Sequence, residues 1–110
     1  MNELADFLLA RIDEESSLAE AAARDAEALA PITDDLRADP GDHRLQHMFL
    51  WSPARVLAEC EARRRIVQDY LAQLGSHRSG WDARTPRDLP LRALGLPYAA
   101  HPDYRQDWRP

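Results

Sequence analysis

The segment from Ser52 to Leu74 constrains the fold most, because it has the marks of a complete amphipathic helix. Ser52 is a suitable N-cap, and Pro53 occupies the first helical position, where a missing backbone N–H costs nothing. Gly75 follows as a left-handed C-terminal residue. At about 100° per residue, one face collects Val56, Leu57, Cys60, Val67, Tyr70, Leu71 and Leu74. We therefore predict a central helix over residues 52–74.

A second amphipathic helix is predicted over residues 1–30. Asn2 and Glu3 favour its start, and Pro31 favours its end. Its apolar face is predicted to consist of Leu4, Phe7, Leu8, Ile12, Leu18, Ala19, Ala22, Ala26 and Leu29. A helix of this length suits an antiparallel hairpin or a bundle. We therefore expect it to pack against the central helix.

The remaining segments predict shorter elements. Residues 31–51 are typical of a linker, with a short helix that Asp42 caps and that runs to Trp51. Residues 75–110 predict a loop, short helices and a tail. Within them, a helix is expected over residues 88–95, capped by Asp88 and ended by Gly95.

The C-terminal tail alternates aromatic residues with turn residues, and one last helical turn is predicted to start at Pro102. Tyr98, Tyr104 and Trp108 are too apolar for a free end, so we expect the tail to be ordered and to fold back over the helices. The predicted fold is therefore all-α, a single helical domain of residues 1–110.

Composition narrows the class of protein. The sequence has no apolar run near eighteen residues and no N-terminal hydrophobic signal, so we expect a cytoplasmic protein without membrane contact. Cys60, the only cysteine, excludes an internal disulfide and a CxxC zinc site, and its position predicts a buried structural thiol. Leu, Ile, Val and Phe make up only 22 of 110 residues. We expect a modest core that a second copy or another protein partner completes.

Charge is distributed unevenly along the chain. Residues 1–42 contain twelve acidic and three basic side chains, for a net charge of −9. Residues 43–110 contain seven acidic side chains and eleven arginines, for a net charge of +4. The acidic half argues against general affinity for nucleic acid, because phosphates would repel it.

Four charged residues interrupt the predicted apolar faces. Arg11 and Glu15 interrupt the face of the first helix, and Arg63 and Arg64 interrupt that of the central helix. Charges on a packing face are costly without a partner. We predict that Glu15 pairs with Arg63 or Arg64 and fixes the register of the two helices. The alternative is that these side chains extend to solvent at the rim of a narrow interface.

His43 and His47 are candidate metal ligands on one face of a predicted helix. Their i,i+4 spacing would let both reach one metal, with Asp39 or Asp42 as an oxygen ligand. Solvated or capping histidines explain the same spacing. The sequence shows no catalytic motif and identifies no small-molecule substrate, and we expect no metal or other cofactor.

Three segments resemble a family of small uncharacterised proteins that is widespread in high-GC actinobacteria and their phages. They are residues 6–14 (DFLLARIDE), residues 53–59 with 64–66 (PARVLAE and RRI), and the closing signature LPYA, HPDY and WRP within residues 96–110. The resemblance implies a domain of unknown function in an intracellular setting. Many members carry a cysteine pair before the closing signature, which this chain lacks, so no zinc site is implied.

These observations favour a non-enzymatic interaction protein, either a homodimer or an accessory subunit. The residues expected to take part are Glu15, Arg63, Arg64, Tyr98, Tyr104 and Trp108. One alternative is a regulator related to nucleic acid, through the arginines of residues 55–65 or through acidic mimicry of phosphates by the first helix. Another is a small metal-dependent enzyme that uses His43 and His47.

Overall fold

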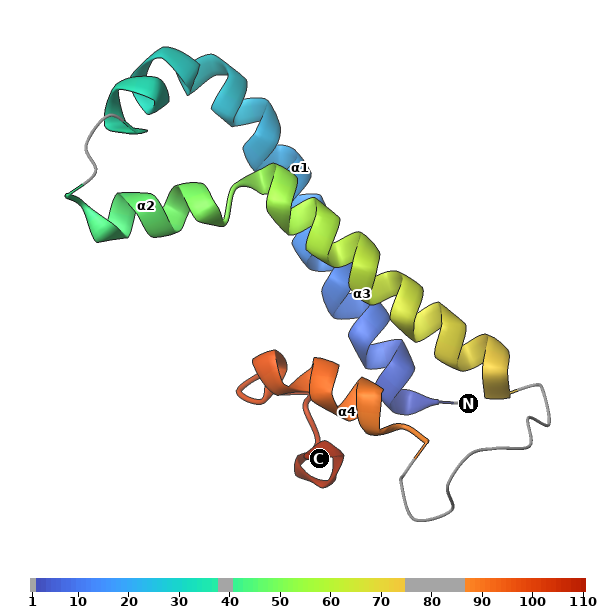
Figure 1. The fold of residues 1–110 in the computed structure, drawn as a ribbon. Coiled ribbons are helices and arrows are strands. Elements are labelled where there is room, and N and C mark those ends of the chain that lie inside the picture. Colours follow the sequence, from blue (N-terminus) through green and yellow to red (C-terminus); the bar gives the residue numbers. More distant parts are fainter. Residues whose placement is uncertain (1, 38–40, 75–86) are drawn as a thin grey trace. The chain divides into compact units, whose positions relative to one another are not determined.

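A computed structural model describes residues 2–37, 41–74 and 87–110, with the side chains of 26–37 excluded. Its helices are α1 (Glu3–Arg37), α2 (His43–Leu50), α3 (Pro53–Leu74) and α4 (Leu89–Gly95), followed by the 3₁₀ turns η1 (Leu96–Tyr98) and η2 (Gln106–Trp108) (Figure 1). The described ranges contain no strand. The predicted all-α fold, with a long N-terminal helix packed against a central helix, is confirmed.

The chain divides into two compact units. Unit 1 consists of residues 1–12 and 62–110, and unit 2 consists of residues 13–61, so α1 and α3 each contribute to both. Charge follows this division. Unit 1 contains ten arginines and seven acidic residues, a net charge of +3, whereas unit 2 contains four arginines and twelve acidic residues, a net charge of −8.

The two long helices begin where the sequence predicts. The Asn2 side-chain oxygen accepts a hydrogen bond from the Ala5 amide at 3.0 Å. The Ser52 hydroxyl accepts one from the Arg55 amide at 3.3 Å, and Pro53 is the first residue of α3. Each cap satisfies an amide that the helix itself leaves without a partner. The predicted stop at Gly75 lies outside the described residues.

The predicted end of the first helix is wrong. α1 does not stop before Pro31 but continues to Arg37. Proline inside a helix removes one backbone hydrogen bond and crowds the preceding turn, at a cost of about 3 kcal/mol, but a bent helix can accommodate it. Figure 1 shows α1 changing direction in its last turns. The predicted linker therefore does not include residues 31–37, which belong to α1.

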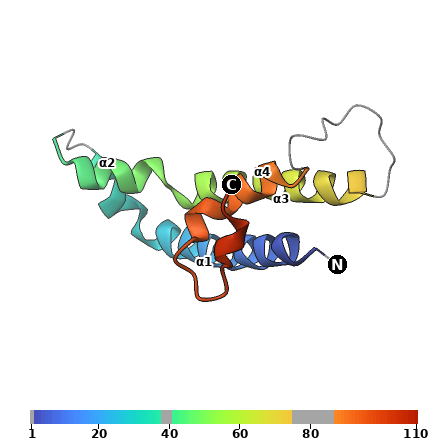
Figure 2. The ribbon, with the colours of Figure 1, turned by 90° about the horizontal axis from the view of Figure 1, so that it is seen from below.

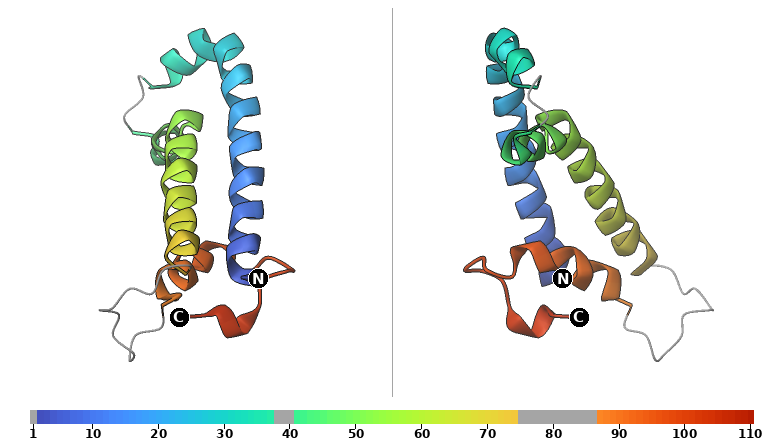
Figure 3. Two further views of the ribbon diagram at one scale, coloured as in Figure 1. Left: turned by 90° about the vertical axis from the view of Figure 1, so that its right-hand side faces the viewer. Right: turned by 60° about the vertical axis from the view of Figure 1, so that its left-hand side comes forward.

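Unit 1 has an aromatic core. Phe7 of α1 lies 6.1 Å from the ring centroids of both Tyr98 and Tyr104, and 5.2 Å from that of Trp108. Aliphatic residues from three helices complete this core, namely Leu4, Leu8, Ile12, Val67 and Leu91. The C-terminal segment lies beside the first turns of α1 in Figures 2 and 3. The predicted ordered tail is confirmed, although its last helical turn is η2 rather than a turn starting at Pro102.

α4 ends at Gly95 as predicted, but for a different reason. Gly95 has a right-handed conformation, with φ −77°, and the chain continues into η1. A Cβ atom at Gly95 would lie 3.4 Å from the Tyr104 ring, so Gly95 packs directly against the tail. The predicted Asp88 side-chain cap is wrong, because its carboxylate pairs with the Arg92 guanidinium at 3.0 Å instead.

Unit 2 has a much smaller core. Among its described side chains, only Ala19 and Cys60 are buried, and α2 contributes none. Burial of Cys60 confirms the predicted structural thiol. The prediction that Leu18 packs with the apolar face of the first helix is wrong, because its side chain is 73% exposed. It projects about 100° away from Ala19, which is the residue that packs inward.

Within the described ranges, none of the helices combines the length and the hydrophobicity needed to cross a bilayer.

Candidate interaction surfaces

An apolar groove on unit 2 is the main candidate site. We call it the unit 2 groove; it has a volume of about 220 Å³ and is lined by Glu15, Leu18, Ala19, Ala22, Trp51, Pro53 and Val56. Its lining combines two small alanines of α1 with the large side chains of Leu18 and Trp51. Six of the seven lining residues are apolar, which suits an apolar occupant rather than a polar substrate.

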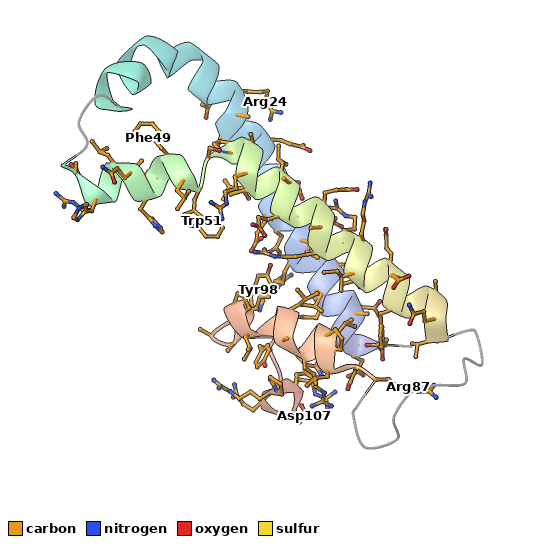
Figure 4. All side chains as sticks on the ribbon, viewed as in Figure 1. Arg24, Phe49, Trp51, Arg87, Tyr98 and Asp107 are labelled. Carbon is orange, nitrogen blue, oxygen red and sulfur yellow. The ribbon has the colours of Figure 1, made fainter. Side chains whose placement is uncertain are left out.

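Trp51 is held at the junction of α2 and α3. Its amide donates to the His47 carbonyl at 3.1 Å, closing α2, and the Asp42 carboxylate caps the other end of that helix. The Arg55 guanidinium lies 4.6 Å over the indole ring. Figure 4 shows Phe49 and Trp51 projecting from opposite sides of the chain here. Trp51 remains 41% exposed, so the indole is positioned but not covered.

Other large apolar side chains of unit 2 are also exposed. Met48 is 65% exposed and Leu50 is 57% exposed, so α2 presents apolar surface although it is an amphipathic helix. Neither residue lines the unit 2 groove, and exposed apolar residues that occur singly are normal. Unit 2 therefore offers more apolar surface than its own core uses.

Glu15 supplies the only charged side chain in the lining of the unit 2 groove. Its carboxylate oxygen lies 3.9 Å from the Cys60 sulfur, within hydrogen-bonding range for a thiol donor. This contact places one predicted site residue on the groove. The predicted pairing of Glu15 with Arg63 or Arg64 joins residues of different units and stays a prediction.

Unit 1 carries a second hollow, a cleft of about 630 Å³. It is lined by Asn2, Glu3, Leu4, Leu71, Leu74, Asp88, Arg92, Arg105, Asp107 and Trp108. Arg92 pairs with Asp88 and donates to the Asp107 carbonyl at 2.8 Å. Arg105 pairs with Asp107 at 3.1 Å and with Glu3. The Asp107 and Glu3 carboxylates raise the pKa of Arg105, and these pairs attach the tail to α1 and α4.

Arg11, one of the charged residues within the predicted apolar faces, has contacts in unit 1 that the structure defines. Its guanidinium lies 5.2 Å over the Phe7 ring and donates to the His101 imidazole. The His101 Nδ1 atom also accepts from the Asp103 amide at 3.0 Å. An arginine inside the apolar face therefore meets an aromatic ring and the tail.

The predicted aromatic site residues have a place in the core of unit 1. Tyr104 and Trp108 are 7% and 9% exposed, and Tyr98 is half-buried beside Phe7. The Tyr104 hydroxyl is buried without a hydrogen-bond partner among the described residues. Their part in an interaction stays a prediction, because their visible role is to hold the tail.

The two histidines of α2 lie apart from any cluster of ligands. His43 and His47 are both exposed, and the nearby Asp42 carboxylate accepts amide hydrogen bonds at the start of α2. No group of three metal-ligating side chains occurs within the described ranges. Asp39, the other predicted ligand, lies outside them. The metal site stays a prediction.

Sequence reasoning missed Leu18 and Trp51 as surface residues. Leu18 continues the apolar periodicity of α1, so periodicity alone places it in the core. Trp51 ends a short apolar segment, and the Ser52-Pro53 pair that follows favours a new helix start. This pattern indicates only weakly that the indole lies at a junction between two helices. Both positions depend on how α1 meets α3, which local patterns do not encode.

Comparison with known proteins identifies a family. The model of DUF6221, a family of unknown function, matches residues 1–110. The chain belongs to this family, which confirms the expected membership in a domain family of unknown function. No curated protein matches the chain, and no solved structure does.

Proposed function

We propose that this member of the DUF6221 family is a non-enzymatic interaction module that binds a protein partner through the unit 2 groove. The observation that carries the proposal is that two exposed side chains, Leu18 and Trp51, line a groove whose other lining is almost entirely apolar. Burying the exposed part of such side chains on binding is favourable by about 25 cal/mol per Å² of apolar surface removed from water. The proposal includes the cytoplasmic setting and the actinobacterial or phage origin that the resemblance implies.

Site-specific photo-crosslinking in the cells that make the protein tests this function. A photo-reactive residue at position 18 is expected to give a discrete protein adduct, because this position lines the groove. The same residue at position 50 is the matched control, since Leu50 is exposed on α2 but does not line the groove. Equal labelling at both positions, or none at position 18, would contradict the proposal.

The net charge of unit 2, −8, favours a second candidate function. In it, the acidic surface mimics nucleic-acid phosphates and inhibits a nucleic-acid enzyme. The two functions depend on different side chains. Leu18→Gln would leave the mimic intact, whereas replacing Asp13, Glu14 and Glu20 by their amides would lower the net negative charge of unit 2 from −8 to −5 and weaken it.

Two further alternatives need only simple assays. Binding of the arginines of residues 55–65 to DNA or RNA would weaken steeply with salt. A metal-dependent enzyme at His43 and His47 would contain stoichiometric metal after purification without an affinity tag. Neither has support comparable to that of the unit 2 groove.

A further inference from the structure

The unit 1 cleft, the hollow of about 630 Å³ lined by ten residues of unit 1, shares no lining residue with the unit 2 groove. Its volume is within the range of about 300–1,000 Å³ that is typical of sites for small organic ligands. Its lining joins apolar side chains of α1, α3 and η2 to charged side chains of α1, of α4 and its cap, and of the tail. A ligand for this cleft should therefore carry both an apolar part and a charge.

The two guanidinium groups of the cleft already have partners. Arg105 donates from Nε and Nη2 to the Asp107 carboxylate, and from Nη1 to the Glu3 carboxylate. Arg92 pairs through Nε with Asp88 at 3.0 Å, and its Nη1 atom donates to the Asp107 carbonyl at 2.8 Å. An anionic ligand would have to compete with these carboxylates for the arginines, so the cleft does not favour an anion.

The carboxylates of the cleft, by contrast, have oxygen atoms that no partner uses. Among the described residues, Glu3 is bonded only through Oε2 and Asp88 only through Oδ2, so Oε1 and Oδ1 have no partner there. Both side chains reach solvent, since Glu3 is 68% exposed and Asp88 is 31% exposed. The lining contains three carboxylates and two guanidinium groups, for a side-chain charge of −1. Unused acceptors and a net negative charge both favour a cation.

The same lining presents an aliphatic surface. Leu74, in the last turn of α3, is 48% exposed, and Leu71, one turn earlier, is partly exposed. Residues three apart lie on one side of a helix, so these two leucines are neighbours on the surface of α3. Leu4 and Trp108 are buried and complete the apolar part of the lining. A chain of a few methylene groups fits such a surface, as the stem of a lysine does when it covers apolar side chains.

We propose that the unit 1 cleft binds a primary alkylammonium group. Its aliphatic chain lies on Leu71 and Leu74, and its charge meets the unused oxygens of Glu3 and Asp88. An ammonium has three N–H donors and no acceptor, which matches a cation site made of carboxylate oxygens. The group belongs either to a free amine or to a lysine of a partner. This chain contains no lysine, so no side chain of a second copy supplies it.

Titration of the ¹⁵N-labelled full chain with n-pentylamine, followed by NMR at constant ionic strength and about pH 7, tests the site with a protonated probe. The amide signals of residues 2–4 and 71–74 are expected to shift, with a dissociation constant on the order of 1 mM for this small ligand. 1-Pentanol and pentanoate replace the ammonium by a neutral and a negative group, and they are expected to bind at least about fivefold more weakly. Equal binding of pentanoate, or no shift at about 50 mM pentylamine, would overturn the proposal.

Two substitutions with matched controls locate the site. Asp88→Asn removes a charge from the cleft and Leu74→Gln removes an aliphatic contact, and each is expected to weaken pentylamine binding by about threefold or more. The controls make the same changes at exposed positions of unit 1 that do not line the cleft, namely Asp69→Asn and Leu89→Gln. They are expected to leave the dissociation constant unchanged within about 1.5-fold. Equal weakening by Asp69→Asn would show that the amine responds only to overall charge, which would overturn the site.

A capped tripeptide with a central lysine distinguishes the two sources of the amine. Tighter binding of this peptide than of pentylamine supports a lysine of a protein partner. Binding of pentylamine without binding of the peptide supports a free amine, and either result supports the alkylammonium site. Equal binding of the same peptide with norleucine in place of lysine would contradict a role for the charge and overturn the proposal.

Discussion

Unit 1 and unit 2 use their apolar residues in opposite ways. Unit 1 buries Phe7, Tyr104 and Trp108 together with aliphatic residues from three helices, and ion pairs attach its tail. Unit 2 buries only Ala19 and Cys60 among its described side chains and exposes Leu18 and Trp51. Since helices α1 and α3 run through both units, the difference arises from the residues and not from the type of element.

The comparison assigns separate roles to the two units. An aromatic core with its charges paired stabilises a fold, while exposed apolar surface beside a groove serves binding. The boundary falls within continuous helices, so a partner bound to unit 2 contacts helices that unit 1 anchors. Stability and binding should therefore respond to different substitutions.

The largest effect is expected for Phe7→Ala. Phe7 contacts four aromatic rings of the tail, so truncation removes the centre of the core of unit 1, at a cost of about 4 kcal/mol. Phe49→Ala is the matched control in unit 2, where the ring is only partly buried and its truncation should cost clearly less, about 2 kcal/mol. Urea unfolding followed by circular dichroism measures both. Equal losses would remove the distinction between the units.

Arg11→Met should have an intermediate effect. The methionine keeps most of the apolar stem but loses the guanidinium that lies over Phe7 and contacts His101, at a cost of about 1.5 kcal/mol. Arg24→Met on the same helix is the control, because Arg24 is exposed in unit 2 and its replacement should cost less than about 0.5 kcal/mol. Thermal unfolding measures both variants. A lower melting temperature for Arg24→Met alone, with Arg11→Met unchanged, would contradict the assignment of the stabilising contact to unit 1.

Asp42→Ala should have a smaller and local effect. It removes the acceptor for the Arg44 and Leu45 amides, which costs about 1 kcal/mol of helix stability in α2. Asp42→Asn keeps a capping oxygen and should retain most of the stability. Amide hydrogen exchange should show faster opening of α2 in the alanine variant, with unit 1 unchanged. Faster exchange throughout unit 1 would mean that the units open together.

Much of the fold could be predicted from local sequence because caps and periodicity are local properties. Asn2, Asp42 and Ser52 accept amide hydrogen bonds at the helix starts where the sequence predicts them. The error at Pro31 has a different source. A proline lowers the stability of a helix without forbidding it, and the sequence does not show whether α1 has enough support to continue.

The candidate site was less predictable because it depends on side chains that packing leaves uncovered. Glu15 was identified from its charge within an apolar face, and it does line the groove. Leu18 belongs to the predicted apolar face of the first helix, and Trp51 was expected only as the end of a short helix, yet both are exposed. The aromatic tail was correctly expected to be ordered, yet order in the tail gives no information about a partner.

The most direct test of the division between core and binding surface is the free energy of unfolding of the Leu18→Gln chain at low protein concentration. Because Leu18 is 73% exposed, a neutral side chain that favours helix should change the stability by less than about 0.5 kcal/mol. A loss of about 2 kcal/mol or more, typical of a buried leucine, would show that Leu18 belongs to the core and would contradict the assignment of binding to unit 2.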